Sequence, residues 1–249
     1  MSSVLEVINL RKEFSGVKAL DDVSFEVKEG QLHSLIGPNG SGKTTMFNLL
    51  TGVYRPTAGS VHLRGASIAG KRPHEIAKRG VARTFQQPRL FTSMTVVDHP
   101  LLAAHANHSP FSFTRNSRAF ARKIISDVGL GDVADRQADS LTQGQQRLLE
   151  IGRALACNPS ILLLDEPHAG LNEQETTRLM EVIRTLNREQ GLTVLLVEHE
   201  MRVVMSLSDA ITVLNFGKKI ADGTPEVIQE DKAVIEAYLG TRNRRKKIA

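Results

Sequence analysis

Residues 37–45 read GPNGSGKTT: Gly37, Pro38, Asn39, Gly40, Ser41, Gly42, Lys43, Thr44 and Thr45. The first eight satisfy the pattern G-x-x-x-x-G-K-[ST], between a predicted strand and a predicted helix. Glycines let the backbone fold around an anion, so that N–H groups and the positive helix end point inward. A glycine-rich turn capping a helix is the alternative, but the strand-loop-helix context favours a nucleoside triphosphate site. Lys43 would reach the β- and γ-phosphates, and the Thr44 hydroxyl would ligate Mg²⁺.

Short apolar runs alternate with helical stretches around this loop. Strands are predicted over 4–10, 23–27, 31–37, 160–165, 192–197 and 210–214. Helices are predicted over 43–50, 119–128, 143–156, 173–190 and 233–238. The pattern predicts an α/β fold: a P-loop NTPase core with a mostly parallel sheet, an antiparallel β subdomain and an inserted α-helical subdomain. We expect one domain over 1–249, with the helical part at about 92–147 and a basic tail at 241–249.

Two carboxylates, Asp165 and Glu166, end the run ILLL at 161–164. This run is apolar without alternation, as in strands buried on both faces of a parallel sheet. Ligands of open α/β sheets bind at the carboxyl edge of the strands. We expect Asp165 to hold Mg²⁺ through water and Glu166 to orient or deprotonate the attacking water. The alternative is a strand that ends in solvated acids, which the nearby phosphate loop disfavours.

A histidine follows another apolar run in the same way. Residues 193–197 form an apolar run that is followed by Glu198-His199-Glu200. The same topology would place His199 at the carboxyl edge of the sheet, within reach of the terminal phosphate. A purely structural role is the alternative for a lone histidine. The other seven histidines show no metal-ligand spacing.

Residues 141–146, LTQGQQ, precede the helical run RLLEIGRALA. Thr142 at the N-cap and Gln145 three residues later form the pattern of a capping box. A helix N-terminus with a hydroxyl and a glycine is also suited to an anion, which would involve Thr142, Gln143, Gly144 and Gln145. Local physics does not choose between a cap and a second anion site.

Composition excludes several classes of protein. The chain is 41% hydrophobic and 24% charged, which is ordinary for a globular protein and excludes collagen-like and wholly disordered chains. Its single cysteine cannot close an internal disulfide. The N-terminus lacks the pattern of a signal peptide, and no stretch reaches the 18 apolar residues of a membrane span. We expect a cytoplasmic chain that does not itself cross a membrane.

The net charge of +5 comes from the end of the chain. The tail TRNRRKKIA holds five basic residues and no acid, so residues 1–240 balance at 27 bases and 27 acids. Within that body, residues 55–125 carry twelve Lys and Arg against two acids. This asymmetry indicates either a partner-facing basic region or a solvated basic face, and not a uniform surface for nucleic acid.

An ordered set of motifs resembles the nucleotide-binding subunit of ATP-binding cassette (ABC) transporters. They are the phosphate loop, Gln86 in ARTFQQ, then LTQGQQ, ILLLDEP, AGLN and VEHE, covering the chain from Phe14 to Leu239. The resemblance implies the ABC ATPase fold, with ATP and Mg²⁺ as cofactors. It implies that Gln86 lies in the loop that senses Mg²⁺ and the membrane partner, that His199 is the switch histidine, and that Phe14 stacks on adenine. In this family two protomers sandwich two ATPs, each between one phosphate loop and the other chain's signature, here LTQGQQ.

Finer details resemble the ATPase components of branched-chain amino-acid uptake systems. The cues are VARTFQ, AGLN with Asn172 in place of Asp, EHEM, and FGKKIADGTPEVI running to AYLG. The departures from the usual family pattern are Thr142 for Ser, Gln143 for Gly, His168 for a small residue, and Asp98-His99 for Glu-Asn. None of them removes a catalytic group.

The resemblance implies an ATPase, peripheral on the cytoplasmic face of the inner membrane, that energises amino-acid uptake. Its implied partners are permease subunits, a second cassette (identical or related) and a substrate-binding protein, with no nucleic acid. An exporter ATPase for lipid-linked cargo and a urea or amide importer are alternatives. A DNA or ribosome cassette would predict coiled coils, paired cysteines or two cassettes, and a small-molecule kinase would not explain the signature. Lys43, Mg²⁺ and His199 would supply most of the rate by positioning and charge stabilisation.

Overall fold

The computed structural model describes residues 2–84, 90–107 and 116–238. The chain divides into two compact units. We call Met1–Ala77 with Thr193–Ala249 the phosphate-loop unit, and Lys78–Leu192 the signature unit. In the described residues, no helix has the length and apolar character needed to cross a membrane. The expectation of a single domain over 1–249 stays a prediction.

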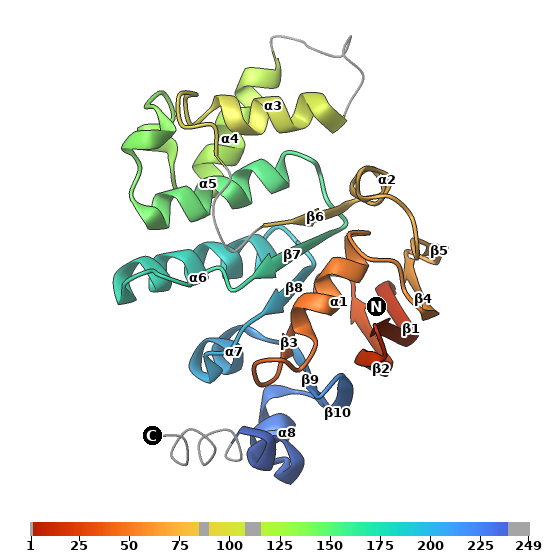
Figure 1. Cartoon of the computed structure of the whole chain (residues 1–249). Helices are drawn as coiled ribbons and strands as arrows, with labels where there is room; N and C mark the ends of the chain where they lie inside the picture. Colours follow the sequence, from red (N-terminus) through yellow and green to blue (C-terminus); the bar gives the residue numbers. More distant parts are fainter. Residues whose placement is uncertain (1, 85–89, 108–115, 239–249) are drawn as a thin grey trace. The chain divides into compact units, whose positions relative to one another are not determined.

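The phosphate-loop unit begins with an antiparallel sheet in the order β2-β1-β4-β5 (Figure 1). Its strands are β1 (Ser3–Phe14), β2 (Val17–Lys28), β4 (Ala58–Leu63) and β5 (Ala66–Ser67). The β1–β2 turn is two residues long, and both Ser15 (φ 46°) and Gly16 (φ 86°) are left-handed. Such turns match the natural twist of an antiparallel pair. The antiparallel part expected near the start of the chain is therefore confirmed.

A second sheet in this unit carries the phosphate loop. Here β3 (Leu32–Ile36) pairs in parallel with both β8 (Val194–Val197) and β9 (Ala210–Asn215), and β10 (Lys218–Gly223) pairs antiparallel with β9. All residues of β3 and β8 are buried, as their unbroken apolar character predicts. The helices are α1 (Lys43–Leu50), α7 (Met201–Leu207), α8 (Pro225–Glu230) and a further helical segment over 232–238. Helix α2 (Pro73–Lys78) lies at the boundary of the two units.

The signature unit pairs β6 (Val81–Arg83) in parallel with β7 (Ile161–Asp165). Its helices are α3 (Asp98–Asn107), α4 (Asn116–Asp127), α5 (Gln143–Leu155) and α6 (Glu173–Arg188), with 3-10 turns at Gly131–Val133 and Ala138–Ser140. Helix α5 packs against α3, α4 and α6. The parallel strands and the helical part confirm the expected ABC-type α/β fold class. Residues 108–115, within the expected helical part, and tail residues 241–249 lie outside the described residues.

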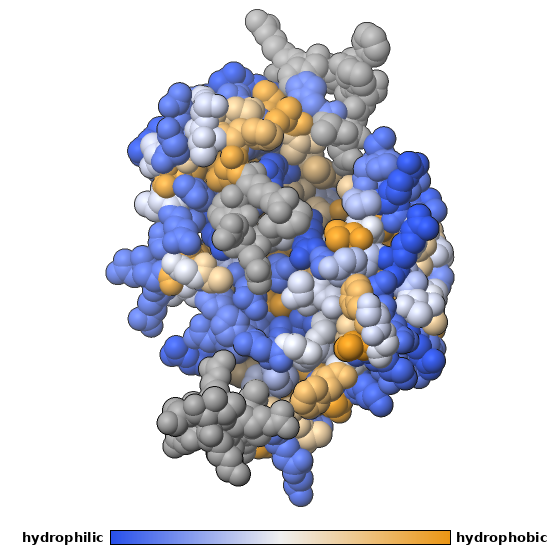
Figure 2. Space-filling model, viewed as in Figure 1, coloured by the Kyte–Doolittle hydropathy of each residue, from blue (hydrophilic) through white to orange (hydrophobic). Residues whose placement is uncertain are grey.

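Apolar side chains gather on the surface of the signature unit over α3 and α4 (Figure 2). Leu102 in α3 and Phe120 in α4 are 43% and 44% exposed. Isolated exposed apolar residues are common, but contiguous apolar surface is typical of a face that another protein covers.

Candidate nucleotide site

The phosphate loop runs from β3 to α1 and depends on glycine at two positions. Gly37 (φ 151°) and Gly42 (φ 108°) are both left-handed. A Cβ atom on Gly37 would lie 2.1 Å from the Leu214 carbonyl oxygen, and one on Gly42 would lie 2.7 Å from a Leu20 methyl group. Side chains at these positions would therefore collide with the neighbouring chain, and only glycine lets the loop close.

Lys43 lies in the first turn of α1 and is buried. Its Nζ donates hydrogen bonds to the carbonyl oxygens of Gly37 (2.6 Å) and Pro38 (3.1 Å), so the ammonium is held inside its own loop. No side chain caps the N-terminus of α1, and its first turn holds no acidic residue. The positive end of the helix dipole and the lysine charge therefore act together at this loop, an arrangement suited to an anion. Thr44 is exposed, and Thr45 is half-buried.

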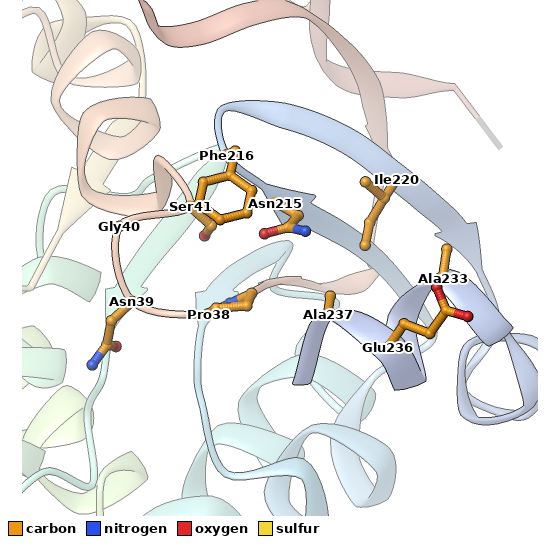
Figure 3. Close-up of a pocket in the computed structure, with 10 residues that line it drawn as sticks. All are labelled: Pro38, Asn39, Gly40, Ser41, Asn215, Phe216, Ile220, Ala233, Glu236 and Ala237. Carbon is orange, nitrogen blue, oxygen red and sulfur yellow. The ribbon is translucent and has the colours of Figure 1, made fainter. Parts of the chain in front are cut away.

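A cavity of about 460 Å³ lies behind the loop, within the phosphate-loop unit (Figure 3). One wall is the loop itself, and the others come from the β9–β10 hairpin and the helical segment 232–238. The ten residues that line it are Pro38, Asn39, Gly40, Ser41, Asn215, Phe216, Ile220, Ala233, Glu236 and Ala237. Pro38, Asn39, Gly40 and Ser41 of the phosphate loop line the cavity, whereas Lys43, Thr44 and Phe14 are not among its lining residues.

The end of the described chain supports the loop from this rear side. The Gly217 N–H donates to the Ser41 carbonyl at 3.0 Å. Burial raises the pKa of Tyr238 to about 12, and the nearby Gly37 backbone opposes the shift. Local sequence patterns do not predict that Tyr238 lies near the loop, because about two hundred residues separate the two.

Phe14 lies at the end of β1 with its ring 38% exposed. Tyr54 packs edge-on against it at a centroid distance of 5.1 Å, and Lys12 Nζ lies 4.7 Å from its centroid. The exposed ring is thus held by neighbours that sequence reasoning did not identify. An aromatic face of this kind can stack on a purine base.

Asp165 ends β7 and is buried in the signature unit. Arg83 Nη2 lies 2.8 Å from Asp165 Oδ2, and both side chains are at least nine-tenths buried. The strands place this pair, because Arg83 is aligned with Leu163 in the β6–β7 ladder. Glu166 follows with a left-handed backbone (φ 45°) and a half-buried side chain. Gln86 lies outside the described residues.

His199 lies just after β8, in the phosphate-loop unit, with a side chain 54% exposed. The carboxylate beside it, Glu198, is fully buried. Glu198 Oε2 accepts the His199 backbone N–H at 2.8 Å and lies 3.6 Å from the ring Nδ1. The buried carboxylate therefore fixes the backbone from which the imidazole projects.

The capping box predicted at α5 is present. The Thr142 hydroxyl accepts the Gln145 N–H at 3.3 Å, and Gln145 Oε1 accepts the Thr142 N–H at 3.0 Å. Sequence reasoning missed a third partner, Glu175 in the first turn of α6, whose Oε1 accepts the Gly144 N–H at 3.2 Å. That hydrogen bond lowers the pKa of Glu175 below its ordinary value, as do hydrogen bonds from the Asn172 N–H and the Thr142 hydroxyl.

Two further contacts join the start of α5 to the loop after Glu166. Arg147 is buried and donates to the Ala169 carbonyl at 3.3 Å, while its guanidinium pairs with Glu150 at 3.6 Å. The Gln143 amide packs so closely on Gly170 that a Cβ there would lie 2.8 Å from Nε2. Burial lowers the pKa of Arg147 from its usual value, although Glu150 opposes the shift.

The structure therefore brings the predicted residues together in two groups. The phosphate loop, Phe14 and His199 belong to the phosphate-loop unit. Asp165, Glu166 and the signature residues Thr142, Gln143, Gly144 and Gln145 belong to the signature unit.

Comparison with known proteins identifies what the chain resembles. The family described as ABC transporter matches residues 20–169, and the family described as branched-chain amino acid ATP-binding cassette transporter matches 218–242. The chain is 47% identical to the high-affinity branched-chain amino acid transport ATP-binding protein BraF of Pseudomonas aeruginosa, over 95% of this chain and 98% of that one. It is 44% identical to the corresponding protein LivG of Escherichia coli, with the same coverage.

Solved structures give the same result. The ADP conformation of MJ1267, an ATP-binding cassette of an ABC transporter, has a TM-score of 0.87 at 33% identity and covers 96% of this chain and 100% of its own. The dimeric post-hydrolysis structure of the cassette MJ0796, bound to ADP and Pi, has a TM-score of 0.76 at 28% identity. It covers 89% of this chain and 98% of its own.

Proposed function

Because the chain belongs to the family of ABC transporter ATP-binding subunits, we propose that it hydrolyses ATP to drive uptake of branched-chain amino acids through a separate permease. The observation that carries the ATPase part is the phosphate loop with buried Lys43 at an α1 N-terminus that no side chain caps. The cargo rests on the relatives BraF and LivG, whose names state branched-chain amino acid transport. It also rests on the match over 218–242, a segment that includes part of the wall behind the loop.

The loop residues Gly37 to Thr45 would bind the phosphates and Phe14 the adenine. Lys43 would exchange the carbonyl oxygens of Gly37 and Pro38 for phosphate oxygens. The exchange is favourable because a hydrogen bond from an ammonium to a charged oxygen is stronger than one to a neutral carbonyl. The lysine is already positioned in the loop, so little further side-chain ordering is needed on binding.

The proposed Mg²⁺ ligands are Thr44, Asp165 and Gln86. Hydroxyl, carboxylate and amide oxygens are the ligands that this cation prefers, so the donor set fits. Arg83 engages Asp165 Oδ2 and keeps the carboxylate oriented. When bound, Mg²⁺ would neutralise phosphate charge.

Glu166 is the proposed base that orients or deprotonates the attacking water. His199 would stabilise charge on the terminal phosphate, with Glu198 holding its backbone in place. Thr142, Gln143, Gly144 and Gln145 would contact ATP held by a second cassette. We further propose that residues 1–249 act as one cassette domain.

The proposed partners are a second cassette, identical or related, permease subunits and a substrate-binding protein, at the cytoplasmic face of the cell membrane. The related cassette MJ0796 is described as a dimer, which supports the first of these. The exposed apolar residues of α3 and α4 support a protein partner on that face.

Transport of leucine tests the proposal. A bacterial strain that lacks its own cassette for branched-chain amino acids, but retains its permease and binding protein, would receive either wild type or Glu166→Gln. We expect wild type to restore uptake of labelled leucine and Glu166→Gln to reduce ATP turnover about 10²- to 10⁴-fold, because it removes the proposed base. The variant should still bind ATP. Uptake that Glu166→Gln restores as well as wild type would contradict the role of Glu166, and restoration of another cargo alone would contradict the assigned substrate.

A further inference from the structure

The N-terminus of α5 carries a carboxylate from another helix. The Glu175 side chain extends from the first turn of α6, and its Oε1 accepts the Gly144 N–H at 3.2 Å. Gly144 is the second residue of α5, so this N–H is one of the donors that a helix leaves unpaired at its start. A negative charge at this place is also favoured by the helix dipole.

Several contacts keep Glu175 there. Its Oε2 accepts the Asn172 N–H at 3.4 Å, and its own N–H donates to Asn172 Oδ1 at 2.9 Å, which is the capping box of α6. One carboxylate therefore caps two helices at once.

Glu175 also lies in direct contact with Gly144. A Cβ atom added to Gly144 would lie 2.9–3.0 Å from three carbon atoms of the Glu175 side chain. A larger residue at 144 would thus push the carboxylate away. The contact with Glu175 therefore requires glycine at this position, independently of the backbone conformation. The Glu175 carboxylate is therefore both hydrogen-bonded to the Gly144 N–H and packed against Gly144.

We propose that Glu175 is a resident anion on the signature, and that the terminal phosphate of ATP carried by a second cassette binds there only by displacing it. The same donor, the Gly144 N–H, would bind each anion in turn. The inference rests on the proposed function, since it takes the signature to act on ATP held by another chain. Glu175 thereby sets the ATP concentration at which two cassettes associate. When no ATP is present, it keeps the Gly144 N–H of α5 hydrogen-bonded.

The test compares two single substitutions in the Glu166→Gln background, where ATP is bound without turnover. Glu175→Gln keeps the shape and the acceptor oxygen but removes the charge. Glu173→Gln is the matched control, because it removes an equal charge from the same helix turn and makes no contact with Gly144. The measurement is the ATP concentration for half-maximal association, followed by light scattering.

We expect Glu175→Gln to lower this concentration about tenfold, since a neutral amide competes less well than a carboxylate for the same donors. Glu173→Gln should stay within about twofold of its parent, as for an exposed charge with no partner. In the nucleotide-free chain, the NMR signal of the Gly144 N–H should shift with Glu175→Gln and not with Glu173→Gln. That readout detects the resident contact without ATP.

Equal ATP requirements for the two variants, or a higher one for Glu175→Gln, would overturn the inference while leaving the proposed function in place. The same measurement is repeated with a related branched-chain cassette added as partner. If the Glu166→Gln parent binds ATP but associates neither with itself nor with that cassette, the signature does not act on a second chain. Both proposals then fail together, and the Gly144 signal identifies Glu175 as a helix cap only.

Discussion

The N-termini of α1 and α5 both present helix N–H donors and the positive end of a helix dipole, but their side-chain surroundings are opposite. At α1, Gly42 occupies the N-cap position, no side chain caps the helix, and the first turn holds no acidic residue. At α5, Thr142, Gln145 and Glu175 all bond to the first turn. A charged ammonium adds to the positive end of α1, whereas a charged carboxylate neutralises that of α5.

This difference shows how one chain can make a strong site and a conditional site from the same motif. The donors of α1 face no competing carboxylate, so an anion gains their full interaction. The donors of α5 are already satisfied, so an incoming anion gains only the difference between two anions. We therefore expect the phosphate-loop unit to provide the primary ATP site, and the signature to respond only to a ligand that binds strongly enough to replace Glu175.

The largest expected effect comes from removing the charge at α1. Lys43→Ala should weaken ATP binding about 10- to 100-fold, which corresponds to the loss of about 1.5–3 kcal/mol from charge-assisted hydrogen bonds. Isothermal titration with ATP in the presence of Mg²⁺ would measure it. Lys43→Arg is the control, because it keeps the positive charge but changes the shape of the charged group. Unchanged ATP affinity in Lys43→Ala would contradict the comparison, because the lysine charge would then contribute nothing to anion binding at the N-terminus of α1.

The next effect concerns acid and the strand that leads into the phosphate loop. Burial lowers the pKa of His33 in β3 to about 4, and its Nε2 lies 2.8 Å from the Thr212 hydroxyl. The folded chain therefore keeps His33 neutral, while the unfolded chain binds a proton at the ordinary pKa of about 6.5. Its contribution to stability is complete above about pH 6.5 and declines as the pH falls toward 4, by about 2 kcal/mol at pH 5.

Urea unfolding of wild type and His33→Gln at pH 7.5 and pH 5 would measure this effect. His62→Gln is a useful control, since His62 lies in β4, away from the strand that leads into the loop. The decrease in unfolding free energy between the two pH values should be smaller in His33→Gln than in wild type by about 2 kcal/mol. An equal decrease in both proteins would show that His33 is not the group that titrates.

The smallest expected effect is the loss of the cap at α5. Thr142→Ala should lower the free energy of unfolding by about 1 kcal/mol, as for other N-cap residues, and Thr142→Ser should restore it. ATP binding to the separate chain should not change, because the hydrogen bonds of Thr142 lie within the signature unit. Thermal unfolding with and without ATP would distinguish the two quantities. If the monomeric Thr142→Ala chain bound ATP more weakly than wild type, the N-terminus of α5 would contribute to ATP binding within a single chain. That result would contradict the difference proposed between α1 and α5.

Much of the fold follows from local sequence patterns. Helix α1 has the expected bounds, α5 differs from expectation by one residue, and the Thr142 cap is present. The strands that are apolar throughout are buried, as expected. By contrast, β6 with three residues and α2 with six are too short to show a period, and sequence reasoning did not identify them.

The partners of the candidate site residues were less predictable. Arg83 beside Asp165, Glu175 beside Gly144 and Tyr238 beside Gly37 each join positions far apart in the chain. Their residue types show no local pattern, because the contact exists only once the strands and helices have packed. The spacing from Asn172 to Glu175 could have indicated a capping box at α6, but not that its carboxylate would also reach α5.

The wall behind the phosphate loop also orders events during biosynthesis. The ribosome makes the loop well before β9 and the helical segment 232–238, which support it. Strand β3 likewise waits for β8 and β9 before it has hydrogen-bonding neighbours in its sheet. A nascent or truncated chain that lacks these elements therefore carries the nucleotide motif without the strands and helix that support it, and we expect ATP to stabilise only a chain that includes them.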